Sequence, residues 1–230
     1  MKQERGLRTR HALIRSAAQE FERHGYAQAK LSDISASAGV SSGALHFHFE
    51  NKAAVAQAVE QEAATTLRRT GRSMLRQDQP LQRLIDISHA LADRILGDVI
   101  ARAGFKLSLE AQGRTGLNLL QEWQGCVQQL LAEASDEGAL AKTVSQQEMA
   151  DSIVAATTGF EVLGRRNGEW LSQESLTGFW QLLLPGLATE EDLVPGGARR
   201  PRGTPQRRPE SPAGEVTPGQ GAQPDRRPFP

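Results

Sequence analysis

Hydrophobic residues recur every three to four positions through most of the first 190 residues. Leu13, Ala17 and Phe21 are four apart, which places them on one face of a helix that ends near His24 and Gly25. The same spacing continues at Leu84, Ile87, Leu91 and Ile95 after Pro80, at Leu120, Trp123, Val127, Leu130 and Leu131 before Gly138, at Met149, Ile153, Ala156 and Phe160, and at Phe179, Leu182 and Leu183. No short alternating run bounded by hairpin turns interrupts it. The pattern therefore predicts an all-α fold of roughly nine or ten helices.

The last part of the chain has a different composition. Nine of the 11 prolines lie at or beyond Pro195, among Gly, Ser, Gln and Arg, with almost no large apolar residue. Such a stretch does not bury enough apolar surface to offset the entropy lost on folding. We therefore expect residues 191–230 to form a disordered tail.

Charge is balanced over the whole chain but segregated along it. There are 27 basic and 27 acidic residues, yet residues 1–52 carry 8 and 5, residues 53–194 carry 12 and 19, and residues 195–230 carry 7 and 3. A basic first segment indicates a polyanionic partner at that end of the chain.

Composition also limits the compartment and the chemistry. The single cysteine, Cys126, excludes an internal disulfide framework and a Cys-rich zinc site, and it is typical of a reducing compartment. No stretch approaches the roughly 18 apolar residues of a membrane span, and the N-terminus has no apolar signal region. We therefore expect a cytoplasmic protein with no membrane partner.

The stretch LSDISASAGVSSGALHFHFENK, residues 31–52, has the pattern of a helix-turn-helix. A short helix from about Leu31 to Ala38 is broken by Gly39, which adopts a left-handed conformation at little cost. Ser41 and Ser42 are suitable caps for a second short helix. The side chains expected to face inward and hold the two helices together are Ile34, Ala38, Val40 and Leu45.

Such a second helix has the dimensions to enter a DNA major groove, which is about 12 Å wide. A plain helical hairpin shows similar spacing, so the surrounding charge matters. The basic residues near the motif, which would contact phosphates and so position the protein rather than specify a sequence, are Lys2, Arg5, Arg8, Arg10, Arg15 and Lys52.

The basic first helix, the turn Ala38-Gly39-Val40-Ser41, the run Gly43-Ala44-Leu45-His46-Phe47-His48-Phe49 and the pair Asn51-Lys52 together resemble a TetR-type transcriptional repressor. The resemblance covers residues 7–60 motif by motif and extends to about residue 190 by layout. That family joins a three-helix DNA-binding head to a larger helical domain for ligand binding and dimerisation. The resemblance implies a head at 1–52, a ligand-binding and dimerisation domain at 53–190, and a homodimer on a double-stranded DNA operator, without a cofactor or metal.

Within that family the chain is similar to the γ-butyrolactone receptors of actinomycetes. It departs from them at Ser41-Ser42, where the family usually has Thr-Lys, and at His46, where it has Tyr. This form looks like the pseudo-receptor branch, repressors in antibiotic gene clusters, some of which sense antibiotics. The resemblance thus implies control of antibiotic or secondary-metabolite genes and a small hydrophobic effector, either a γ-butyrolactone or an antibiotic.

Site residues follow from the same resemblance. It implies DNA contacts from Ser41, Ser42, Gly43, Ala44 and His46, with Lys52 on a phosphate. Leu45 and Phe49 are expected in the core, Phe47 against the first helix, and His48 as a brace for the turn rather than a DNA contact. The ligand pocket is expected to be lined by Phe105, Leu109, Trp123, Val127 and Phe160, although an aromatic stripe at helical spacing is also ordinary core.

Two other classes of function compete with a DNA-binding regulator. An enzyme needs a convergent set of acid, base or nucleophile, and the sequence offers only scattered histidines. His46 and His48 lie roughly 200° apart around a helix, so they do not chelate one metal. The remaining alternative is a small-molecule-binding helical protein without specific operator binding, which the basic first segment argues against.

Overall fold

The computed structural model describes residues 2–73, 79–110, 117–141 and 145–188, all within one compact unit, Met1–Pro195. These residues form nine α-helices and one short 3-10 helix: α1 Lys2–Gln28, α2 Leu31–Ser37, α3 Ser42–His48, α4 Lys52–Ser73, α5 Pro80–Gly97, α6 Val99–Leu109, α7 Leu119–Asp136, α8 Gln146–Gly164, η1 Gly168–Leu171 and α9 Gln173–Leu187. The described ranges contain no strand, only an isolated bridge between Leu140 and Ala188. The predicted all-α fold is confirmed.

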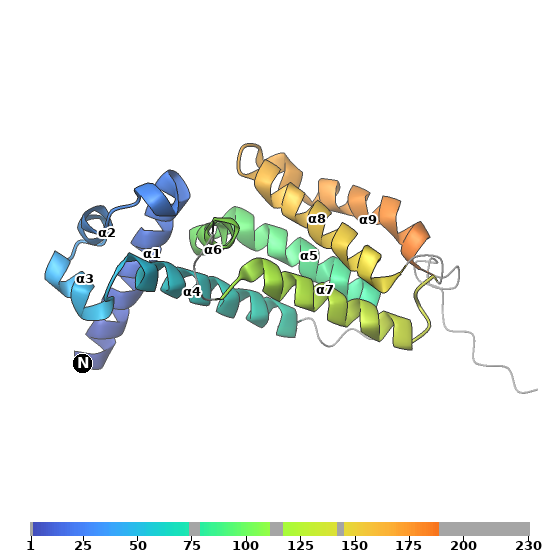
Figure 1. The fold of residues 1–230 in the computed structure, drawn as a ribbon, viewed down its shortest axis with the longest axis horizontal. Coiled ribbons are helices and arrows are strands. Elements are labelled where there is room, and N and C mark those ends of the chain that lie inside the picture. Colours follow the sequence, from blue (N-terminus) through green and yellow to red (C-terminus); the bar gives the residue numbers. More distant parts are fainter. Residues whose placement is uncertain (1, 74–78, 111–116, 142–144, 189–230) are drawn as a thin grey trace, which may run out of the picture. The chain divides into compact units, whose positions relative to one another are not determined.

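Helices α1, α2 and α3 gather at one end of the described unit (Figure 1). Helix α1 is interrupted at Gly25, whose φ of 72° is left-handed, so the regular helix stops where the sequence predicted. The core of these three helices contains four almost fully buried side chains: Leu13, Phe21, Ile34 and Leu45. The three helices, α1 to α3, are called the head below.

Helix α4 leaves the head and crosses α6, against which it packs closely (Figure 1). The two helices approach closely because Gly104 on α6 has no side chain: a Cβ there would lie 2.6 Å from that of Ala63 on α4. Helix α1 also packs against α6. The head is therefore joined to the rest of the unit in two ways, by this packing and by the covalent link from α3 to α4.

Polar contacts secure the end of α1 to α6. Arg102 pairs with Glu22, and the ammonium of Lys106 donates to the Glu22 carbonyl oxygen at 2.7 Å. One turn farther along, Glu110 accepts the backbone N–H of Tyr26 at 2.9 Å. Two residues of α6 and the residue that caps its end, spaced four apart, therefore hold the last turns of α1.

The remaining helices, α5 and α7 to α9, form the body. Each begins at a residue suited to the position: Pro80 opens α5, and side chains of Asn118, Ser145 and Ser172 accept backbone N–H groups at the starts of α7, α8 and α9. Trp180 on α9 is 2% exposed and donates its indole N–H to Ser88 on α5 at 2.8 Å. The buried polar group is thus satisfied inside an apolar core.

Two further predictions concern the C-terminal tail and the membrane. The predicted tail, residues 191–230, lies outside the described residues. Among the residues that are described, none of the helices is both long and apolar enough to cross a membrane.

Candidate DNA-binding face and ligand cavity

The turn before α3 is built from local hydrogen bonds. Gly39 has a φ of 67°, which lets the chain reverse after α2, and the Val40 N–H then returns to the Ser35 carbonyl oxygen at 3.0 Å. The hydroxyl of Ser41 accepts the Ala44 N–H at 3.2 Å and so caps α3. The helix begins at Ser42, and of the two serines that the sequence offered as caps, Ser41 is the one that caps it.

Helix α3 has one buried and one exposed face. Leu45 and Phe49 are 1% and 5% exposed, which confirms their predicted place in the core. On the other side the structure brings together the residues predicted to contact DNA: Ser41, Ser42, Gly43 and His46 are exposed and Ala44 is half-buried. Their contacts with DNA stay predictions.

The prediction for Phe47 was wrong. Its side chain is 84% exposed and does not pack against α1. The reason is helical phase: two residues beyond Leu45 is about 200° around the helix, so Phe47 points away from the core that Leu45 enters. Its ring instead meets the edge of His48, with the two centroids 5.2 Å apart.

Lys52 lies at the start of α4 and contacts the end of α1. Its ammonium donates to the carbonyl oxygens of Ala27 and Ala29 at 3.0 and 3.2 Å, and it sits 4.8 Å from the centroid of the Tyr26 ring. These contacts leave one of its three N–H donors for another acceptor. Lys52 therefore has a structural role in the head, and its predicted phosphate contact stays a prediction.

One basic side chain of α1 lies against the C-terminal end of α3, and Arg15 instead lines a polar hollow with residues of α4, α5 and α6. The Arg10 guanidinium is 5.4 Å from the centroid of the Phe49 ring, and Arg5, Arg8 and Arg15 are exposed. The side chain of Lys2 lies outside those described.

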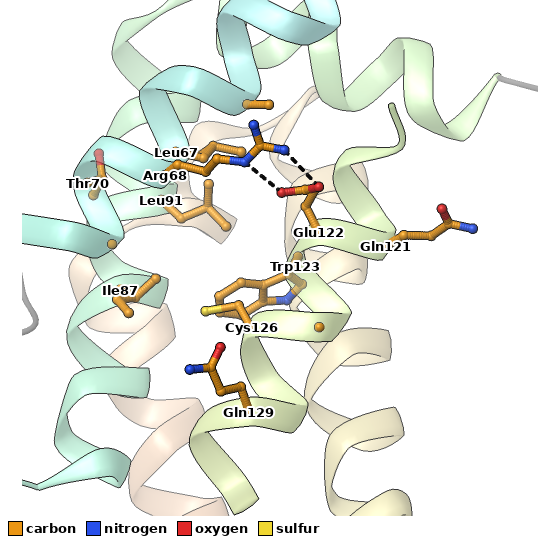
Figure 2. A pocket seen from close by; sticks show the side chains of 13 residues that line it. Leu67, Arg68, Thr70, Ile87, Leu91, Gln121, Glu122, Trp123, Cys126 and Gln129 are labelled. Carbon is orange, nitrogen blue, oxygen red and sulfur yellow. Dashed lines mark hydrogen bonds and ion pairs between the residues drawn. The ribbon is translucent and has the colours of Figure 1, made fainter. Parts of the chain in front are cut away.

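A cavity of about 500 Å³ lies between α4, α5 and α7 (Figure 2). Leu67, Ile87, Leu91 and one side of Trp123 supply its apolar lining, while Cys126 and Gln129 extend it along α7. Burial raises the pKa of the Cys126 thiol, so this side chain acts as a small neutral group in the wall.

Arg68 and Glu122 are the two charged residues in the described lining of this cavity. Arg68 reaches from α4 and Glu122 from α7, and two contacts join them, Nε to Oε2 at 3.0 Å and Nη2 to Oε1 at 2.9 Å (Figure 2). The hydrogen bond and the charge of Glu122 raise the pKa of the Arg68 guanidinium above its ordinary value. The pair ties α4, which carries the chain from the head, to the wall of the cavity.

Comparison with known proteins gives the head its identity. Residues 13–59 match the family model described as bacterial regulatory proteins, tetR family. The solved structure of TylP, a TetR regulator from Streptomyces fradiae, is 30% identical, covers 82% of this chain and 83% of its own, and superposes with a TM-score of 0.60. The chain belongs to the TetR family.

Other TetR relatives are also similar. CprB from Streptomyces coelicolor, solved with its operator sequence, is 28% identical with a TM-score of 0.70, covering 81% of this chain and 92% of its own. The A-factor receptor protein of Streptomyces griseus is 29% identical over 81% of this chain, which spans 66% of that receptor's length. The protein is thus a DNA-binding transcriptional repressor of the TetR type, as the resemblance implied.

In this TetR-family chain, the structure brings three of the five predicted ligand residues together. Trp123 is 6% exposed and lines the cavity, and Phe105 and Phe160 each line a small space beside it. Leu109 and Val127 line none of these spaces. The indole N–H of Trp123 donates to the Thr157 hydroxyl on α8 at 2.8 Å. The residue therefore contributes the apolar surface of its ring to the cavity, and its N–H is already bonded.

Sequence reasoning missed the polar part of the cavity in this TetR-family chain. Nothing in the spacing relates Arg68 to Glu122, because residues 54 positions apart meet only once α4 and α7 have packed. The described residues contain no cluster of His, Cys, Asp or Glu that would hold a metal ion.

Proposed function

We propose that this TetR-family protein acts as a homodimer on an operator that controls antibiotic or secondary-metabolite genes, and that a small hydrophobic ligand releases it. The observation that carries the proposal is that one helix, α4, contacts both the DNA-binding head and the cavity. Helix α4 begins at Lys52 against the end of α1 and reaches the ligand cavity at Arg68.

The DNA-binding part of the proposal rests on α3. Its exposed face carries Ser42, Gly43 and His46 away from the buried Leu45, and Ser41 lies at its start. We propose that these residues and Ala44 contact bases or nearby phosphates, while Lys52 contacts a phosphate. A two-fold operator requires two such helices about 34 Å apart, one in each protomer.

The dimer contact is proposed at α8 and α9. Val162 and Leu163 on α8 are each 44% exposed, and Leu182 on α9 is 86% exposed. The two helices contact each other through the rings of Phe160 and Phe179, and exposed large apolar side chains on them are typical of an interface with another chain. A second copy of the chain is the partner that a two-fold operator requires.

The ligand is proposed to be largely apolar. Most of the surface of the cavity wall is apolar, with contributions from Ala64, Leu67, Ile87, Leu91 and the Trp123 ring, and about 500 Å³ accommodates a small organic molecule. The A-factor receptor and γ-butyrolactone receptors among the relatives make a butyrolactone one candidate. An antibiotic is the other, since the chain departs from the receptors at Ser42 and His46.

Release is proposed to run through α4. A ligand that enters beside Trp123 disturbs the contact between Arg68 and Glu122, and any movement of α4 is transmitted to Lys52 and the head. The spacing of the two recognition helices then changes, and operator affinity falls. Residues 1–52 and 53–190 are in this scheme the DNA-binding and the ligand-binding and dimerisation domains of a cytoplasmic regulator without enzymatic activity.

Fluorescence anisotropy tests the proposal. The full chain is titrated into a labelled duplex from its own upstream region and into a scrambled duplex, at physiological salt, with candidate butyrolactones or antibiotics added. We expect selective binding with two protomers per site and reversal by one compound. Equal affinity for both duplexes would favour the alternative of a small-molecule-binding helical protein.

Variants of two tryptophans separate the cavity from general stability. Trp123→Ala should abolish the ligand response and leave operator affinity intact. Trp170→Ala is the matched control, because Trp170 is 43% exposed on η1 and lies outside the cavity lining. If Trp123→Ala fails to fold, Trp123→Phe keeps the ring and still tests the ligand response.

A further inference from the structure

We propose that Phe47 is a specificity-determining residue of the recognition helix, and that its ring contacts the 5-methyl group of a thymine in the operator's major groove. This inference rests on the proposed operator binding. It concerns a residue outside the set predicted to contact DNA, and it starts from the 84% exposure of a Phe side chain on α3.

The first argument is where Phe47 lies on the helix. Leu45 marks the centre of the buried face, and Phe47 is about 200° from it, close to the opposite pole. Ser42 and His46 lie nearer the sides. A helix that enters a groove with Leu45 facing the protein therefore presents Phe47 to the floor of the groove.

The second argument is Gly43, one turn before Phe47 on the same face. Its backbone is not left-handed, and the nearest atom to an added Cβ would be the Ser41 hydroxyl oxygen at 3.8 Å. The fold therefore does not require glycine here, although glycine weakens a helix by roughly 1 kcal/mol relative to alanine. Helical side chains lean toward the N-terminus, so the absent side chain leaves space beside the Phe47 ring.

The third argument is how the ring is held. The edge of His48 lies against it, with the ring planes at 84°, and His48 is itself half-buried beside Phe49. An aromatic side chain with few rotatable bonds and one edge supported loses little entropy when it binds. A ring held in this way favours contact at one defined position on the DNA over nonspecific apolar contacts.

The chemistry of the ring selects the base. Phenylalanine has no hydrogen-bond donor or acceptor, so it gains little from a phosphate or from the polar edges of guanine, cytosine or adenine. In the major groove the thymine methyl is the apolar group that distinguishes one base from the others. Burying one methyl group against the ring corresponds to about a fourfold gain in affinity for each half-site.

Uracil substitution in the operator tests this contact, because uracil pairs like thymine and lacks only the methyl group. The full-length dimer is titrated against the operator and against duplexes with each symmetric pair of thymines replaced in turn. We expect wild-type affinity to fall about sixteenfold at one pair, because each half-site loses one methyl contact, and Phe47→Ala to bind the thymine and uracil versions of that pair equally. Trp170→Ala, an exposed aromatic outside the head, should keep the full discrimination.

Each outcome decides the proposal. Equal wild-type affinity for every thymine and uracil duplex would overturn it, and so would a Phe47→Ala variant that still discriminates at the same pair. Phe47→Ala should melt with the wild type because its side chain is exposed; if it does not, Phe47→Leu, which keeps an apolar side chain, should retain part of the discrimination. A wild-type protein that binds no operator selectively is a different result, because it would contradict the proposed function as well as the Phe47 contact.

Discussion

The outer face of α3 and the cavity beside α7 are both proposed binding surfaces. They differ in whether their side chains are exposed or already in contact with other groups of the protein. On α3, Ser42, His46 and Phe47 are exposed and are held by the buried residues behind them. In the cavity, Arg68 and Glu122 contact each other and the Trp123 N–H is bound to Thr157. Under this proposal, DNA would bind a surface that is already open, whereas a ligand would have to compete with contacts inside the protein.

This difference assigns the two surfaces different roles in regulation. A surface that binds without breaking internal contacts favours affinity and recognition. A cavity whose mouth joins two helices changes the position of those helices when it is filled, and a change of state is what release from DNA needs. The part of the molecule between them, α4 with α6, has to be rigid enough to transmit the change.

The largest effect we expect is at the packing of α4 on α6. Gly104→Ala places a Cβ 2.6 Å from that of Ala63 and 2.9 Å from Leu119 Cδ1, so the helices have to move apart. The cost is about 1–3 kcal/mol of unfolding free energy, which exceeds the gain of roughly 1 kcal/mol from replacing a helical glycine. Urea denaturation of the two proteins measures it.

Gly125→Ala provides the control for this substitution. Gly125 also lies within a helix, and an added Cβ there would contact nothing within 4 Å. Its replacement should stabilise the protein by up to about 1 kcal/mol. Equal stabilisation by the two substitutions would show that α4 and α6 are loosely packed, and rigid transmission between head and cavity would lose its support.

The head was predictable from the sequence because its signals are local. The left-handed Gly39, the cap at Ser41 and the buried Leu45 all lie within seven residues, and each has a conformational or packing reason that a short stretch reveals. The error at Phe47 came from the family resemblance, which implied a place against α1. Its local phase relative to Leu45 places it outside.

The cavity was predictable only in part because its signals are not local. Trp123 could be chosen by resemblance, but its bond to Thr157 and the pair between Arg68 and Glu122 depend on how α4, α7 and α8 pack. The same holds for Lys52. A basic residue after a helix-turn-helix suggests a phosphate contact, and nothing in the sequence indicates that its ammonium reaches two carbonyl oxygens at and just beyond the end of α1.

An intermediate effect is expected at Lys52, where the head meets α4. Lys52→Ala removes one hydrogen bond to α1, one to the turn that follows it and the contact with the Tyr26 ring, which should lower stability by about 1–2 kcal/mol. It should also weaken binding to every DNA sequence and reduce the salt slope by about one. Thermal melting and anisotropy at several salt concentrations measure the two effects separately.

Lys30→Ala removes the same charge from an exposed position in the head and should leave the melting temperature within the range of ordinary surface substitutions. A Lys52→Ala variant that melts lower but keeps the full salt slope would assign Lys52 a structural role alone. The predicted phosphate contact would then be wrong, and the open surface of the head would consist of α3 and the arginines of α1.

The smallest effect on stability is expected at the cavity mouth, where Glu122→Gln removes the charge that holds Arg68. Both side chains are more than a third exposed, so water replaces much of the interaction and the stability change should stay within about 1 kcal/mol. The ligand response should change more, because a ligand no longer has to separate an ion pair, and release from DNA should need less ligand. Glu137→Gln, at the other end of α7, should leave that concentration unchanged. If both variants respond like the wild type, the ion pair does not oppose ligand entry, and the cavity would be as open as the face of α3.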